Sequence, residues 1–254
     1  MYSELHCKTN YSFLTGGSHA DELVHRAVKL GYRALAVTDE NTLAGIVRAF
    51  GAVREATGNR SPGYSDRPGC SQPHSEKSKC EETPNLQLII GAEVIPNDAP
   101  PLVLWATNRR GYANLSRMIT AGRRRASKGE CWLELADIEQ YAEGLLGGVI
   151  PTFKGERLRT EPMDSLHPSY VWYHREGDCE WTRSESGVLK KLNIYREIFG
   201  DRAYLLASLY RGVDDHWRSD QLKQLSGNSS LPLVSAGDVL YHSPARLPLH
   251  DTLT

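Results

Sequence analysis

Apolar and polar positions along the chain alternate between short, almost continuous apolar runs and longer stretches with helical spacing. The short runs predict strands at 5–7, 33–38, 86–94, 102–106, 145–150, 204–209 and 231–235. Helical spacing predicts helices at 18–30, 43–56, 111–126, 188–199 and 216–225. Continuously apolar strands that alternate with helices are typical of a parallel sheet covered on both faces. The pattern therefore indicates an α/β fold, either a distorted (β/α) barrel with parallel strands or a doubly wound open sheet.

Two segments interrupt this alternation. Residues 57–85 carry Gly, Pro, Ser, Lys and Glu with almost no aliphatic residue, although such connections normally take about two to six residues, so a disordered insertion is predicted. Cys70, His74 and Cys80 within it would offer a zinc knuckle only three ligands, which favours a plain loop. Residues 151–187 are rich in aromatic side chains and predict an irregular excursion over the sheet.

Composition narrows the classes of function. The chain has 30 Lys plus Arg against 31 Asp plus Glu, so it has no global basic field and tight nucleic-acid binding by this segment alone is not expected. No apolar run reaches the ~18 residues of a membrane span, and the N-terminus has no signal pattern. The five scattered cysteines fit reduced thiols better than a disulfide framework. We expect a soluble, cytoplasmic protein without a membrane partner.

Candidate chemistry gathers at the ends of the first two predicted strands. His6 lies at the end of the first strand, and Asp39 and Glu40 follow the second. In an α/β barrel these ends face one mouth, which is where such folds keep their active sites. The residues look like the start of a metal-dependent phosphoesterase site. The sequence offers no Gly-rich phosphate loop, Ser-His-Asp order or C-x-x-C pair as an alternative.

Several blocks of sequence, in the same order, carry a family resemblance. Residues 5–16 (LHCKTNYSFLTG), 32–45 (YRALAVTDENTLAG), 89–93 (IIGAE), 107–116 (TNRRGYANLS) and 237–242 (GDVLYH) resemble the N-terminal PHP domain of bacterial C-family DNA polymerases. Residues 122–129 and 248–254 are similar to the error-prone branch of that family. The resemblance implies a single PHP domain over 1–254, folded as a distorted (β/α)7 barrel with a metal cluster at the carboxyl ends of its strands.

The resemblance also implies a set of metal ligands that this chain keeps only in part. His6 matches the first histidine of an H-x-H pair, Glu93 the bridging glutamate, and Asp238 the aspartate of a D-x-H pair. The expected histidines are replaced at four positions: Lys8, Glu40, Tyr210 and Leu240.

These replacements predict a degenerate metal site. An ammonium at Lys8 would repel a divalent metal by several kcal/mol, or would take its place by pairing with Glu93, Asp238 and Asp39. The sequence therefore predicts no catalytic residue and at most one weakly held zinc or manganese ion. Its ligands would be His6, Glu40, Glu93 and Asp238.

Other polar residues have a structural and a functional interpretation. The basic run Arg123–Arg125 with Lys128 fits contact with nucleic acid or an adjacent polymerase domain, but a basic helix end also complements the helix dipole. His242 and His250 are expected to form structural hydrogen bonds rather than bind metal. Asp39 is either a general base or a carboxylate that caps the loop after its strand.

The function implied by the resemblance is that of the PHP portion of an error-prone DNA polymerase, which serves translesion synthesis and repair. No segment supplies the paired aspartates of nucleotidyl transfer, so the polymerase core and its Mg²⁺ are expected to be absent from this chain. Its partners would be the remaining polymerase domains, DNA through the full-length parent, and replication or mutagenesis accessory proteins. The alternative is a standalone PHP phosphoesterase that depends on metal.

Overall fold

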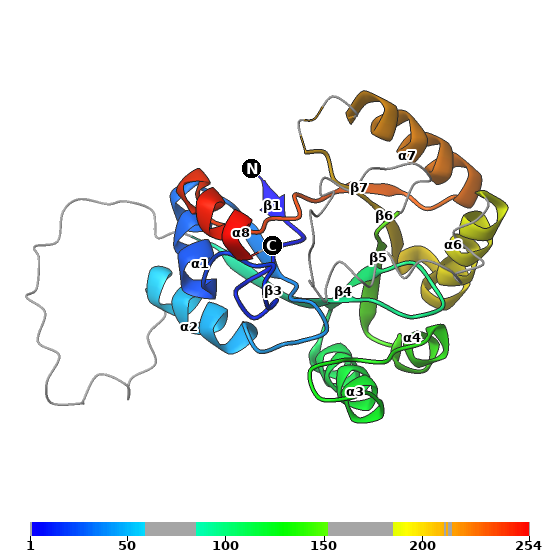
Figure 1. The fold of residues 1–254 in the computed structure, drawn as a ribbon, viewed down its shortest axis with the longest axis horizontal. Coiled ribbons are helices and arrows are strands. Elements are labelled where there is room, and N and C mark those ends of the chain that lie inside the picture. Colours follow the sequence, from blue (N-terminus) through cyan, green and yellow to red (C-terminus); the bar gives the residue numbers. More distant parts are fainter. Residues whose placement is uncertain (1, 59–84, 152–184, 211, 213–214, 254) are drawn as a thin grey trace, which may run out of the picture.

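The computed structural model describes residues 2–58, 85–151, 185–210, 212 and 215–253 (Figure 1). The predicted insertion over 57–85 and the predicted excursion over 151–187 lie almost entirely outside the described residues. The proposed loop with Cys70, His74 and Cys80 lies outside them as well.

The described strands form one seven-stranded sheet in which each strand pairs with its neighbour in the chain. They are β1 (Ser3–Glu4), β2 (Ala34–Val37), β3 (Gln87–Val94), β4 (Leu102–Ala106), β5 (Leu145–Val149), β6 (Ala203–Ala207) and β7 (Leu233–Ser235). The sheet curls into a half-barrel, as Figure 1 shows. This sequential order confirms the barrel-like α/β prediction, because a doubly wound sheet would reverse its strand order near the middle.

The prediction of uniformly parallel strands was wrong for β4. This strand runs antiparallel to both β3 and β5, whereas the other pairs of neighbours are parallel. Only residues 95–101 connect β3 to β4. A parallel crossover needs roughly a dozen residues or more, so a link this short returns the chain in the opposite direction.

Helices cover the outer faces of the curled sheet (Figure 1). They are α1 (Ala20–Lys29), α2 (Ile46–Ala56), α3 (Arg109–Arg125), α4 (Leu135–Tyr141), α6 (Glu185–Phe199), α7 (Asp215–Ser229) and α8 (Leu247–Leu253), with short 3₁₀ turns η2 (Gly200–Arg202) and η3 (Pro244–Arg246). The sequence did not predict α4 and α8, each of seven residues, because two turns give too little periodicity to recognise. None of the described helices is long and apolar enough to cross a membrane.

A small apolar cluster fills the inner, concave side of the sheet beneath the candidate site. Its buried members come from β2, β4 and β6 and from the segment after β7: Ala36, Val103, Trp105, Leu206 and Ala236. The Trp105 indole N–H donates a 2.8 Å hydrogen bond to the carbonyl oxygen of Leu5. A Cβ atom on Gly148 would lie 2.4 Å from the Trp105 ring, so the glycine makes room for it. This packing fixes the segment that carries His6.

The two edges of the sheet meet beyond the ends of β1 and β7. Cys7 and Val239 form a parallel bridge, in which the Lys8 N–H donates to the Val239 carbonyl and the Val239 N–H to the His6 carbonyl, both at 2.9 Å. The buried Glu4 carboxylate adds a third link by accepting the Gly237 N–H at 2.8 Å. We call these two paired segments, 4–8 and 237–239, the seam. The seam brings residues from the two ends of the sheet together at the mouth.

Candidate functional site

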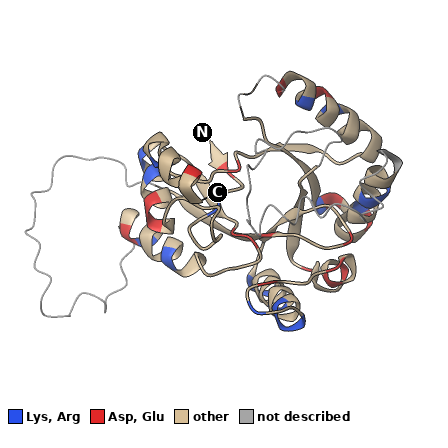
Figure 2. Cartoon of the chain, in the orientation of Figure 1, with Lys and Arg blue, Asp and Glu red and all other residues tan. Residues whose placement is uncertain are grey.

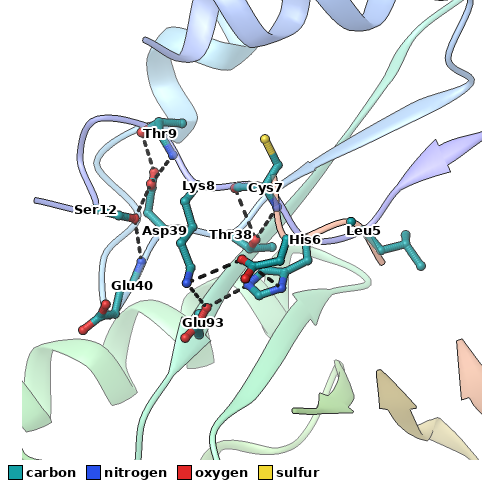
Figure 3. A network of polar contacts seen from close by, with 12 residues as sticks. Leu5, His6, Cys7, Lys8, Thr9, Ser12, Thr38, Asp39, Glu40 and Glu93 are labelled. Carbon is teal, nitrogen blue, oxygen red and sulfur yellow. Dashed lines mark hydrogen bonds and ion pairs between the residues drawn. The ribbon is translucent and has the colours of Figure 1, made fainter. Parts of the chain in front are cut away.

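The candidate site lies at the carboxyl ends of the parallel strands, here called the mouth (Figure 3). His6 and Lys8 follow β1, Glu40 follows β2, Glu93 lies near the end of β3 and Asp238 follows β7. The β4 strand runs in the opposite direction, and none of the candidate residues lies on it. The residues that the sequence pattern singled out therefore lie together at one edge of the sheet.

A buried ion-pair cluster occupies the centre of the mouth. Glu93 Oε2 lies 2.7 Å from His6 Nε2 and 2.8 Å from Lys8 Nζ. Asp238 Oδ1 lies 3.6 Å from both Lys8 Nζ and His6 Nδ1. Because an ionised carboxylate only accepts hydrogen bonds, the short contact assigns the proton of this pair to His6 Nε2. We call His6, Lys8, Glu93 and Asp238 the mouth cluster.

Charge pairing keeps Glu93 ionised despite its complete burial. Burial alone would raise the pKa of this carboxyl, but the Lys8 charge and the His6 hydrogen bond hold the pKa well below its usual range. Lys8 is itself only 7% exposed, so water screens the pair weakly. The lysine therefore offsets a carboxylate charge that would otherwise be buried without compensation.

Asp238 completes the cluster from the seam. Its backbone adopts the left-handed region with φ of 47°, which aspartate tolerates better than most residues. The Tyr210 hydroxyl donates to Asp238 Oδ2 at 3.3 Å, and burial together with the Asp238 charge raises the pKa of Tyr210. The other oxygen, Oδ1, is buried and accepts no hydrogen bond from the described residues.

Three members of the cluster have the chemistry of a metal-binding group. One ligand atom each of His6, Glu93 and Asp238 lie within 4.8 Å of one another. Lys8 Nζ, however, approaches both carboxylates of this group, so the ammonium and a divalent ion would compete for the same oxygen atoms. Two like unit charges 4 Å apart repel by about 4 kcal/mol at an effective dielectric of about 20, and a divalent ion doubles this. With a charged Lys8 in place, the donor set does not fit a metal well.

Glu40, the fourth predicted ligand, lies beside the cluster but is not brought into the metal-binding group. Its backbone bridges to Glu93, while Figure 3 shows its carboxylate directed away from Lys8. Burial raises the pKa of Glu40 to about 7, and the Glu93 charge adds to the rise. The charges of Lys8 and Arg123 oppose it.

Asp39 anchors the loop that follows β1. Its Oδ1 accepts the Thr9 N–H at 2.6 Å and the Ser12 hydroxyl at 2.7 Å, and its Oδ2 accepts the Thr9 hydroxyl at 2.8 Å. Burial raises the pKa of Asp39, and the Ser12 and Thr9 hydrogen bonds counter that rise. These donors engage both oxygens, which favours the capping interpretation over a general base.

The two C-terminal histidines make different contacts, His242 with the N-terminal part of the chain and His250 within the C-terminal segment. The His242 ring Nδ1 lies 2.8 Å from Ser18 Oγ, which in turn accepts the His242 backbone N–H at 3.0 Å. The His250 ring packs against Tyr241 at 5.6 Å between centroids. The Leu240 carbonyl oxygen accepts the Gly17 N–H at 2.7 Å. These contacts tie the C-terminal segment to the start of α1.

Two arginines of the basic run contact the chain itself. Arg123 donates to the Asn41 carbonyl oxygen at 3.0 Å and to the Gly129 carbonyl oxygen at 3.2 Å. Arg125 forms a two-pronged ion pair with Asp137 at 2.8 and 2.9 Å. Arg123 thereby holds the residue that follows Glu40, which links α3 to the mouth.

Sequence reasoning missed the role of Glu4. One of its oxygens, Oε1, accepts three backbone N–H groups, from Leu5, His6 and Gly237, at 2.8–3.0 Å. The available signal was a carboxylate at the start of a predicted buried strand, because a charged residue is rarely fully buried without partners. Its partners could not be read from the sequence, since Gly237 lies at the other end of the chain.

Comparison with known proteins identifies the relatives of this chain. A family model for the PHP domain matches residues 4–206. An error-prone DNA polymerase from Rhodopirellula baltica is 39% identical over 250 residues, which cover 98% of this chain and 18% of the relative. The error-prone DNA polymerase of Pseudomonas aeruginosa is 36% identical over 253 residues, or 100% of this chain and 19% of the relative. The chain thus spans less than a fifth of the length of these relatives.

Solved structures share the fold at low sequence identity. A metal-dependent phosphoesterase from Bifidobacterium adolescentis superposes with a TM-score of 0.53 at 15% identity, covering 96% of this chain and 88% of that one. Endonuclease Q in complex with a duplex that carries an abasic lesion gives a TM-score of 0.50 at 14% identity, covering 96% and 50%. These two likenesses show the fold alone. The match to the family model shows that the chain belongs to the PHP domain family, and the polymerase relatives show that it is homologous to part of the error-prone DNA polymerases.

Proposed function

We propose that this chain is the PHP-domain part of an error-prone DNA polymerase and that it acts as a structural module. Residues 1–254 form one domain in this proposal, and the polymerase core with its Mg²⁺ belongs to another part of the enzyme. Translesion DNA synthesis and repair are then activities of the whole enzyme, which works on DNA in the cytoplasm with its other domains and with replication or mutagenesis accessory proteins.

The observation that carries the structural role is the position of Lys8. Its ammonium lies 2.8 Å from Glu93 Oε2 and 3.6 Å from Asp238 Oδ1, where it balances the carboxylates that a metal would otherwise bind. The ammonium group of a lysine cannot activate a water molecule in the way that a metal ion does, by binding the water and lowering its pKa. The mouth cluster therefore stabilises the fold and supplies no hydrolytic centre.

The direct test is metal content and hydrolysis. We would purify the chain with added manganese or zinc, measure bound metal by mass spectrometry, and assay phosphodiester hydrolysis. The expected result is less than one metal per chain and no turnover that depends on His6. Stoichiometric metal, with turnover lost in His6→Ala but kept in the exposed control His25→Ala, would overturn the structural role.

A second candidate, a standalone metal-dependent phosphoesterase, rests on one observation. Asp238 Oδ1 is buried without a hydrogen bond from the described residues and lies in the group with His6 and Glu93. Such an oxygen is the kind of atom that a weakly held zinc or manganese ion would satisfy. An immunoblot for this domain in its source cell separates the two, because a polymerase subunit would give a band several times larger than 28.3 kDa.

A further inference from the structure

Helix α3 carries an unusual concentration of positive charge. It contains six arginines, and residues 107–129 include no aspartate or glutamate, although the chain as a whole has nearly equal numbers of both signs. Figure 2 shows these basic residues on the outer side of α3, at the periphery of the molecule. The opposite side of α3 is buried against the sheet through Leu115, Met118 and Ile119.

The helix dipole accounts for only part of this charge. Arg123, Arg124 and Arg125 lie in the last turn, where positive charge is favourable. Arg109 and Arg110 lie in the first turn, where positive charge opposes the dipole. The contacts of Arg123 and Arg125 with Asn41, Gly129 and Asp137 also leave the other arginines of α3 unexplained.

Those other arginines form a line along the exposed face. Arg110, Arg117 and Arg124 are spaced by seven residues, which places successive members on nearly the same side of the helix and about 10.5 Å apart. Arg109 lies next to the first of them. We call these four exposed residues the α3 arginine stripe.

The stripe is largely available to a partner. Arg110 pairs with Glu143 at 2.7 Å, but both side chains are more than 60% exposed, and such pairs contribute little. Among the described residues, no carboxylate forms an ion pair with Arg109, Arg117 or Arg124. The stripe also leads toward the mouth, because the neighbouring Arg123 contacts the carbonyl of Asn41, next to Glu40.

We propose that the α3 arginine stripe binds the phosphate backbone of duplex DNA without reading its sequence. Duplex DNA carries about one negative charge per 1.7 Å, a regular array of charge that a line of arginines about 21 Å long can follow. Arginine binds phosphate with a planar, two-pronged geometry. The choice of DNA as the polyanion rests on the proposed function. A local stripe on a chain of balanced charge gives weak binding that supports a larger DNA-binding enzyme.

The test measures binding of the 254-residue chain to a labelled DNA duplex by fluorescence anisotropy as salt is varied. The variant Arg109→Gln/Arg117→Gln/Arg124→Gln removes three charges from the stripe. The matched control, Lys29→Gln/Arg33→Gln/Lys190→Gln, removes three exposed charges elsewhere. We expect the stripe variant to bind DNA at least about tenfold more weakly than the wild type at ~50 mM salt. The slope of log Kd against log salt concentration should be smaller by about two to three. The control should stay within about twofold of the wild type.

Equal binding by the stripe variant and the wild type, equal loss in the control, or no binding by the wild type would overturn the proposal. Tighter binding of labelled poly-glutamate than of DNA would also overturn it and would identify an acidic polypeptide as the partner. Circular dichroism confirms that the variants fold. The metal assay tests a different proposal. If the chain bound stoichiometric metal and also bound DNA through the stripe, the structural role of the mouth cluster would be overturned and the stripe proposal would stand.

Discussion

The Lys8 ammonium lies 2.8 Å from the same Glu93 oxygen that accepts the His6 ring proton at 2.7 Å. Two donors from alternate residues of one segment thus converge on one buried acceptor from another strand. This arrangement holds the segment after β1 against β3 at the mouth, so the polar cluster contributes to the packing of the sheet as well as to its charge balance.

Removing the lysine is expected to destabilise the fold strongly. Lys8→Ala leaves Glu93 buried without its cation, and loss of one partner of a buried pair costs about 3–5 kcal/mol. Urea unfolding at pH 7 measures the loss. Lys223→Ala, which breaks the exposed pair with Asp220, should change the free energy of unfolding by less than about 1 kcal/mol. Equal effects of the two substitutions would show that the Lys8 pair is not structural.

Restoring histidines is expected to restore metal affinity. Lys8→His together with Leu240→His removes the competing ammonium and adds two imidazole ligands near His6, Glu93 and Asp238. Removal of a repulsion of several kcal/mol should tighten manganese or zinc binding by about a hundredfold or more. Isothermal titration calorimetry measures the affinity, with His25→Ala as the control for incidental surface binding. Unchanged affinity would mean that the backbone of the mouth no longer presents these positions to one ion.

Glu40 is expected to make stability fall as pH rises. Burial raises its pKa in the folded chain from 4.5 to about 7, so between these values the folded state binds more protons than the unfolded state. The contribution of Glu40 to the free energy of unfolding is therefore fully present below about pH 4. It is lost as pH rises through 7, and the loss is on the order of 2–3 kcal/mol.

The variant Glu40→Gln isolates that effect. It should be more stable than the wild type at pH 8 and close to it at pH 4.5, as measured by urea unfolding across this range. The exposed residue Glu139 supplies the control, since Glu139→Gln makes the same chemical change at the surface. A Glu40→Gln difference that is independent of pH would contradict the prediction.

Glu4 is expected to be essential for joining the edges of the sheet. Glu4→Ala leaves one buried and two partly buried N–H groups without their acceptor. Each unsatisfied buried donor costs about 1–3 kcal/mol, so we expect a total loss of about 3 kcal/mol. Glu4→Gln keeps one oxygen acceptor and should lose less than half as much. Hydrogen exchange of the Gly237 amide reports on the seam directly and should accelerate in the alanine variant. The exposed control Glu130→Ala should leave both measurements unchanged.

Local signals in the sequence predicted most of the fold. Continuous apolar runs marked β2 to β7. The strands β2, β4, β5 and β6 are largely buried, whereas β7 has an apolar sequence although its residues are exposed or half-buried. The hydrophobic pattern could not predict that β4 runs antiparallel, because it carries no information on strand direction. The short link over 95–101 did indicate this direction, since it is too short for a parallel crossover. The short helix α4 also lacked a recognisable start, because its capping box begins with Glu134 instead of the usual Ser or Thr.

The sequence predicted which residues lie at the strand ends of the candidate site. It did not predict which side chains those residues contact. The ends of β1, β3 and β7 placed His6, Glu93 and Asp238 correctly, since parallel strands deliver their carboxyl ends to one edge. Whether Glu40 would turn toward them depended on side-chain direction, which the sequence does not specify. The acceptors of Arg123 and Arg125 depended on tertiary contacts in the same way.

The seam also determines when the fold can be completed. Cys7 pairs with Val239, so the link between the two edges of the curled sheet forms only after residue 239 is available. Contacts of such long sequence separation form slowly, because the entropy of closing the loop is lost before the contact is gained. During synthesis His6 and Lys8 are therefore made long before Asp238. The mouth cluster is complete only once the seam has formed.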